Sequence, residues 1–318
     1  MIDAASQECS TAEARCATRS RAAGLDPIGT TGSYQGYLLV DVALPWPADL
    51  ATLDEVREVQ ALLSGTGIRF QATVPVGDRR VVLYRQAPTG RGQPPSVPNL
   101  VRSETDAGEG DRHGLTAAVE RMLRATVTAD PGVGREVAVC THGRRDVCCG
   151  ARGSRLHQEL VDGPELVGPT VRIRRTSHTG GHRFAPTAIV LPEATAWAYL
   201  DVDLLRAIVA RSGPVTAVLG RYRGWAGLGS PRLQALERAV LAEVGWDLFD
   251  RSRWGEEDDG VARLHVECEA GASIWEATMT AGRRVPRPEC GEAECGEAVS
   301  AGGKADTELV VNDLRRLT

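Results

Sequence analysis

Residues 136–160 read EVAVCTHGRRDVCCGARGSRLHQEL, a stretch that predicts a strand, a cysteine-bearing turn and a helix. The apolar run at 136–140 is typical of a short buried strand and ends on Cys140. A helix is expected over 151–160, directly after Cys149. A strand followed at once by a helix indicates an α/β fold. The cysteines would then lie just beyond a strand end, where scaffolds often place functional groups.

A second motif, His178-Thr-Gly-Gly-His182, follows a strand predicted at 170–175. Thiolate and imidazole are the ligand types that share iron or zinc. On a helix, histidines four residues apart would share a face, but two adjacent glycines would cost that helix about 2 kcal/mol relative to alanine. We therefore predict that 178–182 is a loop that wraps a bound group.

The rest of the chain divides by composition. The order of elements predicted after residue 136 is compatible with a thioredoxin-like layer of helices on a mixed sheet. We expect an N-terminal α/β unit over 1–90 and a linker rich in Pro, Gly and charge over 91–112. A second α/β domain is expected over 113–229, and a C-terminal helix with a small β extension over 230–318. Strands are predicted at 36–44, 68–74, 80–85 and 187–191, and helices at 50–63, 115–125, 202–210 and 231–244.

Bulk composition narrows the function classes. A net charge of −5 over 318 residues gives no reason to expect nucleic-acid binding. No apolar run reaches the length of about 18 residues that a membrane span needs, and residues 1–17 show no signal-peptide pattern. We therefore expect a cytoplasmic protein. In that reducing compartment, eight cysteines favour metal binding or redox chemistry over a disulfide framework.

Several chemistries remain open for the cysteines and histidines. Structural zinc is one, although its usual short cysteine knuckle is absent because Cys140 and Cys149 are nine residues apart. A dithiol redox site lacks the C-x-x-C spacing, since Cys148 and Cys149 are adjacent. Core cysteines with unrelated histidines are a third interpretation.

The two motifs, C-T-H-G-R-R-D-V-C-C-G and H-T-G-G-H-R-F-A-P-T, closely resemble the sucrase/ferredoxin-like family. Cys9-Ser10 and the region 29–46 also resemble the N-terminal part of that family. The resemblance implies a thioredoxin-like [2Fe–2S] ferredoxin domain, preceded by an α/β unit that we interpret as a degenerate relative of the same fold.

The resemblance also implies a ligand set. Cys140 and Cys149 would bind one iron of the cluster, and His178 and His182 the other. Cys148 is an alternative to Cys149, because either of the adjacent cysteines can supply the second thiolate.

Two thiolates offset the charge of an oxidised [2Fe–2S] core, so such a site accepts an electron more readily than one with four. Ligation by two histidines raises reduction potentials to roughly −150 to +300 mV, against about −400 mV for plant-type ferredoxins. We expect a single-electron carrier with a pH-dependent potential and an unknown redox partner protein. The rivals are a zinc-stabilised structural or binding module, and an enzyme acting on a small anionic substrate. Sucrase activity is not expected, because no motif marks the carboxylate pair of a glycosidase.

Polar residues around the motifs have two interpretations. His142 is a candidate hydrogen-bond donor behind the ligands. A group of arginines would dock an acidic redox partner or stabilise added negative charge. The alternative is an ordinary solvated face with internal pairs such as Arg155 with Glu159. The candidates for docking are Arg144, Arg145, Arg175 and Arg183.

The C-terminal cysteines have no assigned role. Cys268, Cys290 and Cys295 could form a second metal site with His265, but their spacing is unspecific. Cys9 and Cys16 are interpreted as free thiols in a loosely packed N-terminal segment.

Overall fold

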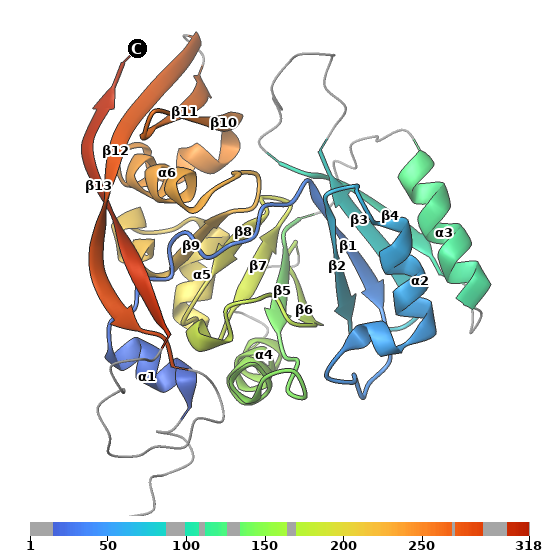
Figure 1. The fold of residues 1–318 in the computed structure, drawn as a ribbon. Helices are drawn as coiled ribbons and strands as arrows, with labels where there is room; N and C mark the ends of the chain where they lie inside the picture. The colour runs from blue at the N-terminus through green and yellow to red at the C-terminus, as the bar shows by residue number, and fades with distance from the viewer. Residues whose placement is uncertain are drawn as a thin grey trace, which may run out of the picture.

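The structure is a computed structural model that describes residues 15–86, 99–107, 112–125, 134–163, 170–268, 271–288 and 304–317. It is an α/β protein, as the sequence predicts. A large mixed sheet runs through its middle, and a smaller antiparallel sheet lies at one end (Figure 1).

The large sheet has nine strands in the order β4-β3-β1-β2-β6-β5-β7-β8-β9. Its N-terminal half comes from residues before 107 and its other half from residues after 135. The halves meet where β2 pairs antiparallel with β6, with Thr73 opposite Thr176. The strand bounds are β1 (Gly36–Asp41), β2 (Ile68–Thr73), β3 (Arg80–Arg85), β4 (Val101–Asp106), β5 (Glu136–Cys140), β6 (Arg172–Thr176), β7 (Ala188–Leu191), β8 (Thr195–Trp197) and β9 (Tyr222–Trp225).

The linker predicted at 91–112 is corrected over part of its length. Val101–Asp106 form β4, which pairs antiparallel along the whole of β3. Local composition predicted a linker because five of the six residues of this strand, which lies at the edge of the sheet, are polar. Pairing with β3 satisfies the backbone groups on one side of this strand, which composition does not reveal. Residues 91–98 lie outside the described part of the chain.

Two of the helices begin at residues whose side chains cap them, whereas the helix predicted at 50–63 begins only at Asp54, after a short 3₁₀ turn. Asp201 caps α5 by accepting a hydrogen bond from the Leu204 N–H, and Ser230 caps α6 by accepting one from the Leu233 N–H. Pro231 occupies the first turn of α6. The bounds are α1 (Cys16–Ala22), α2 (Asp54–Leu62), α3 (Arg112–Arg124), α4 (Ser154–Asp162), α5 (Val202–Ala210) and α6 (Pro231–Val244), with a short 3₁₀ turn η1 (Leu50–Thr52) before α2. Among the described residues, no helix combines the length and hydrophobicity needed to cross a membrane.

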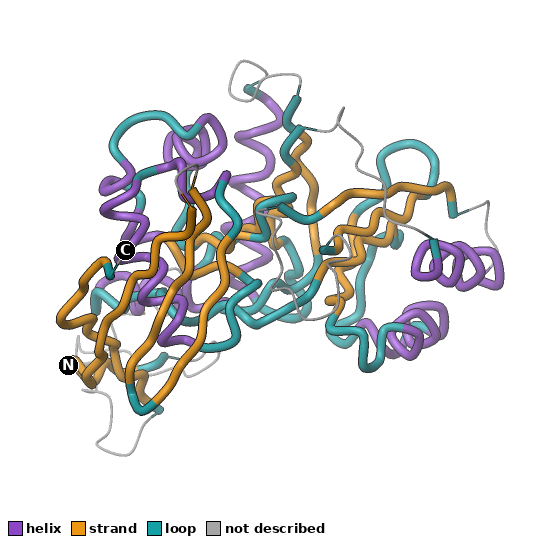
Figure 2. Tube along the Cα trace, turned by 90° about the horizontal axis from the view of Figure 1, so that it is seen from above, coloured by secondary structure: helices purple, strands orange, loops and turns teal. Residues whose placement is uncertain are grey.

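The C-terminal extension is the expected helix followed by strands. α6 leads into an antiparallel sheet in the order β10-β11-β12-β13, whose long β12 and β13 lie along one side of the molecule (labelled in Figure 1; the same strands are orange in Figure 2). One hydrophobic core joins both sheets, because Leu236 and Val240 of α6 belong to the same buried cluster as Val139 and Leu264. The bounds are β10 (Arg253–Asp258), β11 (Val261–Cys268), β12 (Gly271–Pro286) and β13 (Ala305–Arg316).

Candidate metal centre

The first cysteine and the first histidine meet because two parallel strands end together. β5 and β6 pair in parallel, with Cys140 opposite Thr176. His178 follows two residues after Thr176, so it leaves the sheet at the same edge as Cys140. The C-terminal edge of parallel strands is where open α/β sheets place their ligands.

A tight turn brings the second cysteine back to this edge. The chain is helical from residue 147 and passes through a π-turn, η2 (Cys149–Gly153), before α4. Asp146 caps this helix, since its Oδ1 accepts hydrogen bonds from the Cys148 N–H (2.8 Å) and the Cys149 N–H (3.3 Å). A Cβ on Gly153 would lie 1.8 Å from the carbonyl oxygen of Cys140, so glycine is required for this close approach.

Three predicted ligands gather at one point. The ligand atoms of Cys140, Cys149 and His178 all lie within 4.8 Å of one another. The Cys149 Sγ is 3.8 Å from the His178 Nδ1. Both cysteines are fully buried, whereas His178 is half-buried. Two thiols and an imidazole at this spacing can converge on a metal.

The pKa values of the Cys140 and Cys149 thiols shift in opposite directions. The Cys149 thiol donates a hydrogen bond to Cys140 and thereby holds the pKa of Cys140 well below its ordinary range, although burial opposes this; His178 lowers it further. The same interaction, with burial, raises the pKa of Cys149. The structure therefore favours ionisation of Cys140 over that of Cys149, and a bound cation would favour ionisation of both.

His182 stands beside this trio and contacts an acid. It opens the short turn η4 (His182–Phe184), and its ring centre is 6.1 Å from that of His178. Its Nδ1 lies 3.1 Å from the Asp146 Oδ2. Sequence reasoning missed Asp146; the signal was an acidic residue two positions before a cysteine pair, in a helix N-cap position.

The two adjacent cysteines face different partners. While Cys149 faces Cys140 and His178, the Sγ of Cys148 lies 3.4 Å from the Sγ of Cys16. Cys16 is fully buried in α1, which corrects the prediction of a loosely packed N-terminal thiol. Cys9, Cys290 and Cys295 and the side chain of Cys268 lie outside the described residues.

The family follows from the sequence of this region. A model of the sucrase/ferredoxin-like family matches residues 27–224, which is more than half of the chain. The chain belongs to the sucrase/ferredoxin-like family. No curated protein and no solved structure matches it.

The histidine loop of this sucrase/ferredoxin-like protein is held by two arginines. Arg69 donates a hydrogen bond to the His178 carbonyl (3.0 Å), and Arg223 donates one to the Gly180 carbonyl (3.1 Å). Gly180 and Gly181 adopt φ of +82° and +69°, which favours glycine. Burial, with the nearby charges of Arg69 and Arg183, lowers the pKa of Arg223 to about 10.

Two of the other predicted residues of the sucrase/ferredoxin-like site, His142 and Arg145, line a cavity of about 220 Å³ together with His178. His142 contacts the Pro47 carbonyl (2.7 Å) through Nε2, and burial lowers its pKa. Arg144 and Arg145 are exposed on the turn that leads into Cys148 and Cys149, which with these cysteines and η2 is called the cysteine turn below. Arg175 is half-buried, and its Nε lies 3.4 Å from the Thr141 Oγ1. His265 stacks on Trp254 and contacts Glu256.

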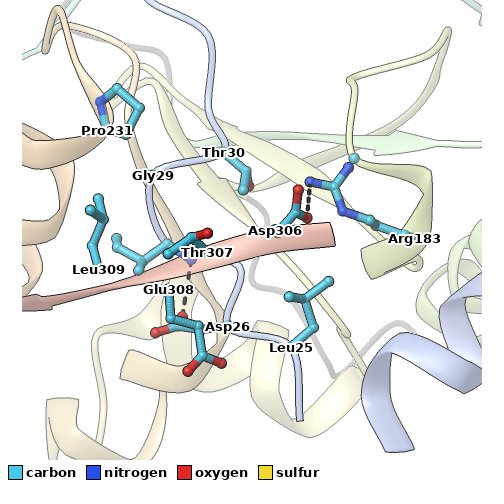
Figure 3. Close-up of a pocket in the computed structure, with 12 residues that line it drawn as sticks. Leu25, Asp26, Gly29, Thr30, Arg183, Pro231, Asp306, Thr307, Glu308 and Leu309 are labelled. Atoms are coloured by element: carbon cyan, nitrogen blue, oxygen red, sulfur yellow. Dashed lines mark hydrogen bonds and ion pairs between the residues drawn. The ribbon is translucent and has the colours of Figure 1, made fainter. Parts of the chain in front are cut away.

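Arg183 lines a cavity of about 410 Å³ (Figure 3). It pairs with Asp306 of β13 at 2.8 Å. The other two acids of the lining also pair with arginines, Asp26 with Arg238 and Glu308 with Arg283. Two of these pairs therefore join the C-terminal extension of the sucrase/ferredoxin-like chain to earlier segments, and the third joins β12 to β13.

Proposed function

We propose that this protein carries single electrons on one [2Fe–2S] cluster held by Cys140, Cys149, His178 and His182. The observation that supports it most is the convergence of Cys140, Cys149 and His178 within 4.8 Å at the end of two parallel strands. Membership of the sucrase/ferredoxin-like family agrees with it.

The donor set is compatible with such a cluster. The pKa of the Cys140 thiol is already lowered, which favours the thiolate form in which cysteine binds a metal. An imidazole that donates from Nδ1 to a carboxylate binds metal through Nε2, and Asp146 is placed to hold His182 in this tautomer. The cluster would supply one-electron chemistry. The chain would orient its ligands, exclude water from the thiolates and hold a proton between His182 and Asp146.

The surroundings suit an electron acceptor with an acidic partner. Arg223 is buried and donates its hydrogen bonds to the Thr30 hydroxyl and to the carbonyls of Thr30 and Gly180, so its positive charge favours an added electron nearby. Arg144 and Arg145 are exposed on the turn that carries Cys149, which supports docking of an acidic redox protein.

The test is the visible spectrum of protein purified without oxygen, recorded before and after dithionite and followed by a titration of the reduction potential at several pH values. Broad visible absorption that bleaches on reduction, with two irons per chain, is the expected result. A colourless protein with stoichiometric zinc would overturn the electron-transfer proposal, because Cys140, Cys149 and His178 are also a zinc ligand set.

A further inference from the structure

A second buried thiol pair lies beside the candidate metal centre. The Sγ atoms of Cys16 and Cys148 are 3.4 Å apart, and both residues have 0% exposed surface. Cys16 begins α1, whereas Cys148 lies 132 residues later in the chain, next to Cys149. Neither belongs to the proposed ligand set, so the function proposed above leaves this pair unexplained.

The surroundings of the pair favour a neutral product over a metal. Cys16 and Cys148 pack with Ala17 and Ala185 in a small apolar cluster. Asp146 is the acid close enough to share a metal with them, but its oxygens already contact two N–H groups and His182. Two thiolates beside that carboxylate would bury several negative charges. A disulfide carries no charge and needs no further ligand.

We propose that Cys16 and Cys148 form a thiol–disulfide redox pair that closes by exchange with a low-molecular-weight disulfide. The Sγ atoms must approach from 3.4 Å to about 2.05 Å. Two S–H bonds break and one S–S bond forms. The two electrons and two protons pass to the exchanging disulfide, which leaves as two thiols. Because both thiols are buried, exchange requires local opening of α1, a helix of seven residues.

A disulfide between Cys16 and Cys148 would restrict the motion of the two segments that carry proposed ligands, the turn with Cys149 and the turn that begins at His182. α1 packs against η4, which begins at His182, and Arg152 of the cysteine turn donates a hydrogen bond to Thr18 of α1. A Cys16–Cys148 bond would therefore tie the histidine turn to the cysteine turn through α1. This consequence rests on the proposed function, whereas the redox pair itself does not.

The test uses the full chain, oxidised glutathione as the probe and mass spectrometry. Native protein is incubated with oxidised glutathione, denatured in iodoacetamide and digested with trypsin. The expected product joins peptide 16–19 (CATR) to peptide 146–152 (DVCCGAR). Its mass is two hydrogen masses below the sum of CATR and of DVCCGAR with one carbamidomethyl group. Fragmentation must place the bond on Cys148 and the alkyl group on Cys149.

Matched variants separate the pair from its neighbours. Cys148→Ser should abolish the cross-linked peptide, and Cys149→Ser should retain it. A bond to Cys149, a Cys140–Cys149 bond, or alkylation of both Cys16 and Cys148 would overturn the proposal. So would a stoichiometric metal that blocks the reaction and is lost in Cys16→Ser. A wild-type chain that forms the bond but never binds iron would contradict the proposed function alone.

Discussion

The Asp146 carboxylate lies between the histidine turn and the cysteine turn, with its Oδ2 3.1 Å from the His182 Nδ1. Its Oδ1 accepts hydrogen bonds from the backbone of Cys148 and Cys149. One side chain thus links two segments that are separated by more than thirty residues of sequence. Carboxylates that orient metal-binding histidines in this way tune both affinity and tautomer.

We expect Asp146→Asn to weaken metal binding by about 10–100-fold while the chain stays folded. Asparagine retains an oxygen for the two N–H groups but places an amide nitrogen against the His182 Nδ1–H. Metal content after a chelator challenge measures the effect. Asp203→Asn, at a position with 91% side-chain exposure, is the control. Equal metal retention in both variants would show that Asp146 does not support metal binding.

Serine replacements should distinguish the two adjacent cysteines. Cys149→Ser removes a thiol from the trio with Cys140 and His178, so it should abolish metal binding. Cys148→Ser removes the contact with Cys16 instead, so the variant should bind as much metal per chain as the wild type. Metal analysis and the visible spectrum read out both. The reverse pattern would assign the second thiolate to Cys148.

Gly153→Ala should disrupt the cysteine turn. The new Cβ would lie 1.8 Å from the Cys140 carbonyl oxygen, so backbone must move. Overpacking of this kind costs about 1–3 kcal/mol of the free energy of unfolding. Metal binding should fall as well, because Cys140 is displaced. Gly229→Ala, exposed and with open space around its Cβ, is the control for urea denaturation; identical midpoints would refute the prediction.

The core ion pair between Glu237 and Arg253 should dominate the stability of the C-terminal extension. Both side chains are 0% exposed, and the Arg253 Nε lies 2.7 Å from the Glu237 Oε1. Glu237→Gln leaves the arginine charge buried without its counter-ion, which costs about 3–5 kcal/mol. Urea denaturation measures this loss. Asp54→Asn, in an exposed pair with Arg57, should change the midpoint little.

The pH dependence of stability should include a term from His157. Burial, and then the Arg175 charge, lowers the pKa of His157 in the folded chain. Below its unfolded pKa of about 6.5, the unfolded chain binds a proton that the folded chain does not. Stability from this residue is therefore fully present above that pH and is lost as the pH falls. His157→Gln should reduce the drop in urea midpoint between pH 7 and pH 5; an unchanged drop would contradict this.

The sequence was sufficient for the main elements around the site. The strands 136–140 and 187–191 and the helices 202–210 and 231–244 were predicted nearly as the structure has them. Short-range signals explain this success: an apolar run for each strand, and the caps Asp201 and Ser230 for the helices. β8 and β9 were missed, because strands of three or four residues carry too little periodicity.

By itself, the sequence determined which cysteines and histidines are the candidate ligands and that they follow strand ends. Tertiary structure decided their partners. Adjacent residues of a helical turn point about 100° apart, so only the packing of η2 against β5 determines that Cys149, and not Cys148, faces Cys140. The packing of α1 likewise places Cys16 beside Cys148. Contacts across such sequence separations depend on the whole fold, and no local pattern encodes them.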